Sequence, residues 1–168
     1  ISREEQEAFA INSHKKALFA INEGNFNKEI IPIEFNGNTV IVDEGPREPN
    51  LDKIKSLEPA FDAEGSITAA TSSPISIGSS AILLASNKTA EDCGIKPEFK
   101  ILSRSIAGVD WTRMGMGPIP ATEKALRNAN LSINQIDVIE LNEAFAAQSL
   151  YVIKKAEWDI NKINLNGG

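Results

Sequence analysis

The fold is decided by one stretch of the sequence, Asp137-Val138-Ile139-Glu140-Leu141-Asn142-Glu143-Ala144-Phe145-Ala146-Ala147-Gln148. Its first five residues have the apolar pattern of a strand, and residues 143–156 have the spacing of a helix. A second strand pattern follows at residues 163–165. A strand, a helix and a strand in this order predict a parallel βαβ unit, and therefore an α/β protein.

Further strand and helix patterns lie upstream of this unit. Residues 100–107 are strand-like, and residues 120–129 have the pattern of an amphipathic helix. Residues 67–70 and 81–85 have the composition of buried strands, with a bend of small residues between them. A short helix is predicted over residues 86–93, capped by Ser86 and closed by Gly94. Together these patterns predict a mixed sheet with flanking helices.

The N-terminal third predicts a helix and a hairpin. Ser2 followed by Glu5 is a capping-box pattern, and Gly24 can supply the left-handed residue that ends the helix. Two β-prone runs around Asn36-Gly37 predict a hairpin, because asparagine and glycine tolerate the positive φ of a type I′ turn. The proline-rich residues 43–59 predict a linker with a short helix near residues 51–57.

The composition excludes several classes of protein. Of the 168 residues, 42% are hydrophobic and 24% are charged, as in globular proteins, and no apolar run approaches the ~20 residues of a membrane-spanning helix. The net charge of -6 argues against non-specific nucleic-acid binding. The single cysteine, Cys93, fits a reducing compartment, which we expect to be cytoplasmic. One cysteine and one histidine cannot form a zinc cluster alone, so we expect no metal site.

Three residues draw attention for their chemistry. Asn142 stands where the predicted strand ends and the predicted helix begins, so its carboxamide either caps the helix or faces a ligand beside the positive helix end. His14 lies on the apolar stripe of the first helix, which predicts a partly buried imidazole. Cys93 falls at a helix end without an electropositive surrounding, which predicts an unreactive thiol.

Residues 140–148 resemble the Asn-Glu-Ala-Phe motif of the thiolase family, in a strand-to-helix setting like theirs. Other segments resemble the family in the same order along the chain, and the resemblance covers nearly all of it. These segments are residues 2–10, 13–14, 28–32, 57–61, 108–110, 114–115, 117–121 and 163–168. The run Thr68-Ala69-Ala70-Thr71-Ser72-Ser73 is similar to the stretch with which thiolases bind pantetheine, in the form closer to degradative 3-ketoacyl-CoA thiolases.

The resemblance implies roles for residues near the reacting thioester. Asn142 would hold a water that stabilises an oxyanion on the thioester carbonyl. Ser73, with Ala69 close by, would bind the pantetheine arm of coenzyme A. The alternative for Ser73 is a hydroxyl that only bonds the local backbone.

The resemblance also implies a channel and a nucleotide contact. Phe61, Met114, Ala144 and Phe145 would line the acyl and pantetheine channel, and each would otherwise be an ordinary core residue. Arg47 would face the nucleotide end of coenzyme A, or would be a solvated loop residue.

By the same resemblance, the parent protein would cleave 3-ketoacyl-CoA with coenzyme A, or run the reverse condensation. Coenzyme A would be a substrate, and no cofactor is expected. Thiolases use a nucleophilic cysteine, an activating histidine and a second, proton-shuttling cysteine, and none of these three falls within this sequence. The chain starts at Ile1 and stops after a strand pattern, so we expect an internal fragment that is inactive in isolation. The alternative is a non-catalytic module that binds coenzyme A or assembles with partner chains.

The resemblance divides the chain into three segments. Residues 1–60 would form a covering segment, residues 61–97 the end of the first thiolase half, and residues 98–168 the start of the second half. The parent would be a dimer or tetramer, and a degradative parent would join a hydratase/dehydrogenase subunit. Because both halves lack part of their sheets, we expect exposed strand edges, and either marginal stability or oligomerisation that covers them.

Overall fold

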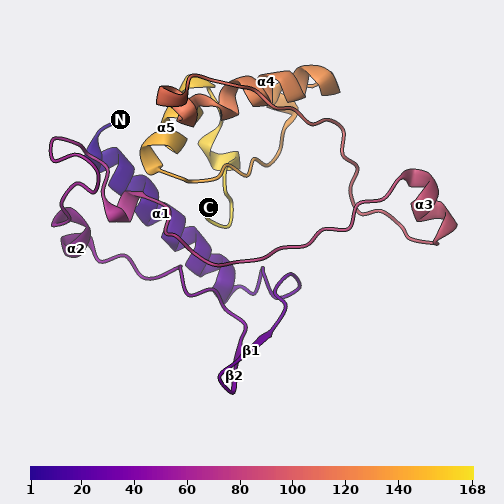
Figure 1. Cartoon of the computed structure of the whole chain (residues 1–168), viewed down its shortest axis with the longest axis horizontal. Coiled ribbons are helices and arrows are strands. Elements are labelled where there is room, and N and C mark those ends of the chain that lie inside the picture. The colour runs from indigo at the N-terminus through magenta and orange to yellow at the C-terminus, as the bar shows by residue number, and fades with distance from the viewer.

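A computed structural model describes the whole chain, residues 1–168 (Figure 1). Its α-helices are α1 (Arg3–Asn22), α2 (Leu51–Lys55), α3 (Asn87–Asp92), α4 (Pro118–Ala129) and α5 (Ala146–Lys155). Strands β1 (Ile33–Phe35) and β2 (Asn38–Val40) form an antiparallel pair. Short 3-10 helices lie between these elements, namely η1 (Ala69–Thr71), η2 (Trp111–Met116), η3 (Ile133–Gln135) and η4 (Ile160–Lys162).

The core lies around α5, which contacts both α1 and α4 (Figure 1). Five buried residues form one hydrophobic cluster, namely Leu141, Val152, Ile153, Trp158 and Ile163. Partly buried side chains from α1 and α4 complete it, among them Phe9 and Ile119. Elements from both ends of the chain therefore share one core.

The predicted N-terminal elements are confirmed. The Ser2 hydroxyl accepts a hydrogen bond from the Glu5 N–H at 3.2 Å, and the Glu5 carboxylate accepts one from the Ser2 N–H at 2.7 Å. Gly24, just after α1, has a φ of +73°. Asn36 and Gly37, with φ of 50° and 77°, form the turn between β1 and β2. Both ends of α1 and the hairpin thus follow from local sequence signals.

Polar side chains attach α1 to the segment that follows α2. The Arg3 guanidinium pairs with the Glu7 carboxylate at 2.8 Å and donates to the Leu57 carbonyl at 2.6 Å. The buried Gln6 amide donates to the Ser66 hydroxyl at 2.9 Å. The buried side of α1 is therefore partly polar, because it faces backbone and hydroxyl groups as well as apolar side chains.

The predicted parallel βαβ unit is present in a minimal form. The Ile139 N–H donates to the Lys162 carbonyl at 2.8 Å, and the Asn164 N–H donates to the Ile139 carbonyl at 2.9 Å. These bonds form a parallel bridge between Ile139 and Ile163, with α5 as the crossover. Helix α5 begins at Ala146, three residues later than predicted, and Phe145 occupies its N-cap position without a side-chain cap. The interpretation of Asn142 as a helix cap is therefore wrong.

The predicted strands upstream of α4 are wrong, except that Thr68, in the strand predicted over residues 67–70, forms an isolated antiparallel bridge with Pro59. Residues 69–71 form the 3-10 turn η1, and residues 81–85 and 100–107 lie outside any strand. Residues 74–110, called the arm below, run out and back as two extended segments joined by α3 (Figure 1). A strand requires a neighbour that completes its backbone hydrogen bonds, and no segment of this chain pairs with the arm. The one regular sheet is the β1–β2 pair, which is much smaller than the predicted mixed sheet.

The predicted helix on the arm is confirmed. The Ser86 hydroxyl accepts a hydrogen bond from the Thr89 N–H at 3.1 Å at the start of α3, and Gly94 follows the helix with a φ of 65°. Local capping signals therefore operate even where the surrounding chain is unpaired.

The surface of the chain is unusually large. It exposes 13041 Å², whereas a compact monomer of 18.2 kDa exposes about 8,100 Å². Large apolar side chains on the arm contribute to the difference, namely Ile75, Ile77, Ile82, Leu83, Leu84, Phe99, Ile101, Leu102 and Ile106. No helix in the structure combines the length and the apolar composition that crossing a membrane requires.

Candidate functional site

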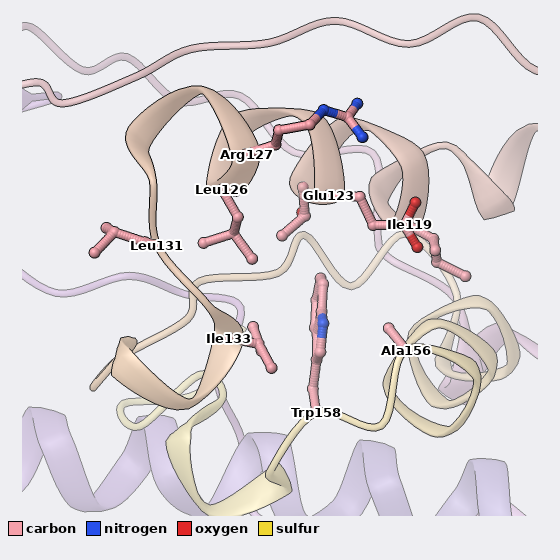
Figure 2. A pocket seen from close by; sticks show the side chains of 9 residues that line it. Ile119, Glu123, Leu126, Arg127, Leu131, Ile133, Ala156 and Trp158 are labelled. Carbon is pink, nitrogen blue, oxygen red and sulfur yellow. The ribbon is translucent and has the colours of Figure 1, made fainter.

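An apolar cavity of about 320 Å³ lies between α4 and the chain that follows α5. In Figure 2 the Trp158 ring stands between Ile133 and Ala156 and points toward the Leu126 side of the cavity. The other lining residues are Ile119, Thr122, Glu123, Arg127 and Leu131. None of the predicted site residues lies there, so this cavity is not the candidate site.

A second cavity, of about 310 Å³, does contain predicted residues and is called the site cavity below. Arg47, Ala69 and Ser73 all line it, although they come from two separate loops. Helix α1 forms one wall, and the segment after the βαβ bridge contributes Gly168. The full lining is Phe9, Ala10, Ser13, His14, Ala17, Asp43, Gly45, Pro46, Arg47, Ala69, Ala70, Thr71, Ser72, Ser73, Pro74, Glu143, Ala146 and Gly168.

Backbone pairing joins the two most informative segments of the sequence. The Ser73 N–H donates to the Ala144 carbonyl at 2.9 Å, and Ser72 forms an antiparallel bridge with Phe145. The Phe61 ring meets the Phe145 ring edge to face, with centroids 5.9 Å apart. Four of the predicted residues therefore lie together beside the site cavity.

The hydroxyl groups next to this pairing differ in their partners. The Ser72 hydroxyl donates to the Thr68 carbonyl at 2.8 Å, so Ser72 makes the local backbone bond. Ser73 is exposed, and its hydroxyl takes part in no hydrogen bond of the structure. The Ser73 hydroxyl therefore remains available to a ligand.

Asn142 and Met114 lie outside the site cavity. Asn142 is exposed and makes no side-chain hydrogen bond, and it is not among the lining residues, although the next residue, Glu143, is. Met114 is 67% exposed on η2, and Phe61 is 72% exposed. The interpretation of these two side chains as ordinary core residues is therefore wrong.

His14 lines the site cavity, and its pKa is shifted by the groups around it. Its Nδ1 accepts a hydrogen bond from the Arg47 N–H at 3.4 Å. Burial, and then the positive charge of Arg47, lower the pKa of His14 below its ordinary value of 6.5, while the negative charge of Glu143 opposes the shift. The imidazole is therefore neutral near pH 7, and Nε2 carries the proton. The predicted partial burial of His14 is confirmed.

Sequence reasoning missed Asn164, which is only 2% exposed. Its carboxamide bonds the backbone of Leu141 and the carboxylate of Glu143, on either side of Asn142. The signal in the sequence was an asparagine, which tolerates a positive φ, inside the strand pattern of residues 163–165 and close to Gly167-Gly168. Cys93, by contrast, is exposed at the end of α3 and does not line the site cavity.

Comparison with protein families agrees with this arrangement. The model described as "Thiolase, N-terminal domain" matches residues 1–88, and the model described as "Thiolase, C-terminal domain" matches residues 95–168. The chain belongs to the thiolase family. The three-segment division predicted from the sequence stays a prediction.

Individual thiolases are similar over the whole of this chain. The 3-ketoacyl-CoA thiolase of Acinetobacter baumannii (strain AYE) is 49% identical over 179 residues, and that of Alcanivorax borkumensis is 47% identical over 178 residues. Each alignment covers 100% of this chain but only 45% and 46% of the relative. The chain thus spans less than half the length of these thiolases.

Solved structures show the same relation. The crystal structure of the Bacillus anthracis acetyl-CoA acetyltransferase superposes with a TM-score of 0.94 at 41% identity, and that of human mitochondrial 3-ketoacyl-CoA thiolase with 0.97 at 37%. All of this chain is covered, against 44% and 43% of those chains. The structure is therefore a partial thiolase fold, as the sequence predicts.

Proposed function

We propose that this chain provides part of the coenzyme A thioester site of a 3-ketoacyl-CoA thiolase. The observation that carries the proposal is that Arg47, Ala69 and Ser73 line one cavity, beside the turn that contains Asn142 and Glu143. A cavity of about 310 Å³ is at the lower end of those that hold drug-sized ligands. The site cavity therefore has room for the pantetheine arm or the acyl group, and the nucleotide of coenzyme A would lie outside it.

The polar groups of the site cavity suit such a ligand. Pantetheine contains amides, which donate and accept hydrogen bonds. The Ser73 hydroxyl and the His14 Nε2–H supply donors, and the Glu143 carboxylate supplies an acceptor. Arg47 would meet a phosphate at the mouth. Asn142, next to the lining residue Glu143 in the chain, would orient a water toward the thioester oxygen, which becomes negatively charged during acyl transfer.

The proposal includes binding without turnover by this chain. Acyl transfer in thiolases requires a thiolate nucleophile, and the lining of the site cavity contains hydroxyl groups but no thiol. The one cysteine, Cys93, lies on the arm, at the end of α3. Its unpaired thiol supports a reducing, cytoplasmic setting as part of the proposal.

Calorimetric titration of the chain with coenzyme A and with acetoacetyl-CoA tests the proposal. We expect saturable binding, weakened about 3- to 10-fold by Ser73→Ala, because one hydrogen bond contributes about 0.5–1.5 kcal/mol. Ser79→Ala is the matched control, since Ser79 is an exposed serine of the arm outside the site cavity. Equal affinities for the Ser73 variant and the unchanged chain would contradict the assignment of Ser73.

Product analysis after incubation with acetoacetyl-CoA and coenzyme A tests the second half of the proposal. We expect no acetyl-CoA to form. Formation that persists in Cys93→Ser would show a nucleophile that the structure does not place in the cavity, and it would overturn binding without turnover.

A second proposed role is assembly with other thiolase-type chains, and the exposed arm favours it. The chain exposes about 4,900 Å² more than a compact monomer of its mass, and its arm is rich in isoleucine and leucine. A stable protein interface buries about 1,600 Å², so the arm has enough area for one. We propose that the chain associates with copies of itself through the arm, as in the dimers or tetramers expected from the sequence.

Light scattering coupled to size exclusion measures this directly. We expect a mass above 18.2 kDa that falls when Ile77 and Leu83 are both changed to serine. A monomer at all concentrations would refute the assembly role and leave the proposed ligand site untouched.

A further inference from the structure

Asn164 lies at a junction between the two ends of the core. Its backbone N–H donates to the Ile139 carbonyl at 2.9 Å, and its carbonyl accepts from the Lys16 ammonium of α1 at 3.1 Å. Its φ of 46° is in the left-handed region, which asparagine tolerates better than most residues. This backbone turns the side chain back toward the strand that ends at Leu141.

The carboxamide of Asn164 bonds both backbone groups of Leu141, as the backbone of a neighbouring strand would. Its Oδ1 accepts from the Leu141 N–H at 2.7 Å, and its Nδ2 donates to the Leu141 carbonyl at 2.8 Å. The second Nδ2 hydrogen goes to the Glu143 carboxylate at 2.7 Å. Both donors of a side chain that is 2% exposed are therefore used, as a buried carboxamide requires.

These three bonds hold both neighbours of Asn142. Leu141 is fixed through its backbone and Glu143 through its carboxylate, so the backbone of Asn142 is held between two fixed neighbours. Glu143 itself lines the cavity. The Asn164 side chain is thus linked to the cavity through Glu143 rather than by direct contact, because Asn164 is not among the lining residues.

Gly168 closes the same network from the other side. A Cβ on Gly168 would lie 2.2 Å from Asn164 Nδ2 and 2.6 Å from a Glu143 carboxylate oxygen. Any side chain there would push the carboxamide or the carboxylate out of place. The hydrogen bonds between Gly168 and Ser13 hold this segment against α1.

We infer that Asn164 is a positioning residue of the ligand site, which sets the Glu143 carboxylate and the Asn142 turn for the coenzyme A thioester. This inference rests on the proposed function. It differs from a purely structural role in one measurable respect. A structural residue changes the fraction of folded chain, whereas a positioning residue changes the affinity of the chain that is folded.

The isosteric substitution Asn164→Asp tests the inference. The carboxylate keeps an acceptor for the Leu141 N–H but loses both donors, and it faces the Glu143 carboxylate with like charge. With the folded fraction monitored by Trp158 fluorescence in a Trp111→Phe background, we expect the Kd for coenzyme A at neutral pH to rise at least 10-fold. Asn161→Ala is the control, because the exposed Asn161 side chain bonds only Asp159 and should leave the Kd unchanged.

A second substitution restores one of the lost bonds. In Asn164→Asp combined with Glu143→Gln, the Gln amide donates to the new carboxylate across the same 2.7 Å gap. We expect the double variant to recover about half of the lost affinity on a logarithmic scale. An unchanged Kd for folded Asn164→Asp would overturn the inference while the proposed function stands.

Hydrogen exchange of the Leu141 amide tests the network without a ligand. We expect this buried amide to exchange at least 10-fold faster in Asn164→Gly, which keeps the positive φ but removes the acceptor, with the Val152 amide of α5 unaffected. Equal exchange in both proteins would show that the tether does not form and would overturn the inference. If the unchanged chain fails to bind coenzyme A, the proposed function falls, and the ligand role of Asn164 falls with it.

Discussion

The βαβ unit at residues 137–168 and the arm at residues 74–110 have similar apolar patterns, but several large apolar side chains are buried in the unit, whereas those of the arm are exposed. Ile163 in the unit is 2% exposed, whereas Ile77 in the arm is fully exposed. The unit includes its own crossover helix and packs on α1, whereas no strand pairs with the arm, which bonds α4 through the Ser103 hydroxyl and the Ile106 carbonyl. Apolar sequence therefore marks what can be buried, and the presence of a partner decides whether burial happens.

The largest expected difference between the two regions comes from truncating an isoleucine in each. Ile163→Ala leaves a cavity in the core cluster and should lower the free energy of unfolding by about 2–5 kcal/mol. At concentrations low enough to keep the chain monomeric, Ile77→Ala should change it by less than about 0.5 kcal/mol. Urea unfolding measures both, in a Trp111→Phe background, so that only the buried Trp158 reports. Equal effects would show that the arm is covered in solution.

A glycine in each region gives the next largest contrast. Gly167 has a φ of +87°, and a Cβ there would lie 2.8 Å from the Ser13 carbonyl, so Gly167→Ala should cost about 2 kcal/mol or more. Gly78 has an open surrounding and no positive φ, so Gly78→Ala should be neutral or slightly stabilising. Urea unfolding midpoints of the two glycine variants measure this difference. A neutral Gly167→Ala would mean that the loop does not dock on α1.

The two N-cap serines sharpen the comparison further. Ser2→Ala removes the cap of α1 and should lower the free energy of unfolding by about 1 kcal/mol. Ser86→Ala removes the equivalent cap of α3, but it should only speed exchange of the Ala90 amide, because α3 stands apart from the core. A shift of the Trp158 transition in Ser86→Ala would contradict the independence of the arm.

The smallest effect concerns the pH dependence of the core region. The pKa of His14 is lowered in the folded chain, so between that value and 6.5 the unfolded chain binds more protons. The stability contributed by neutral His14 is therefore fully present above pH 6.5 and is lost as the pH falls through 6.5 toward the lowered value. His14→Gln should show a smaller fall in urea midpoint between about pH 7.5 and pH 5.5. Parallel falls in both proteins would refute this.

The parts of the fold that the sequence predicted are those set by neighbours along the chain. The capping box at Ser2 and the Asn36-Gly37 turn involve residues within a few positions of each other, and both appear as predicted. The strands at residues 81–85 and 100–107 were wrong because a strand depends on a distant partner. Helix α5 was predicted three residues too early, since Ala144 and Phe145 pair with the segment at Ser72 and Ser73.

The candidate site divides in the same way. Resemblance to the thiolase motifs pointed to Ser73, Ala69 and Arg47, and the fold brings all three to one cavity. Asn164 had no local signal strong enough to single it out, because its role depends on Leu141 and Glu143, which lie more than 20 residues earlier. A buried carboxamide that bonds both backbone groups of a distant residue is visible only in three dimensions.

The contact between Ser13 and Gly168 spans 155 positions of the chain and has a consequence for synthesis. A ribosome adds about 5–20 residues per second, so α1 emerges on the order of 10 seconds before the loop it binds has been made. During that interval its contact surface, including Phe9 and Ala17, stays open to chaperones and to other nascent chains. Slowing translation between the codons for α1 and those for Gly168 should therefore increase chaperone capture of this protein.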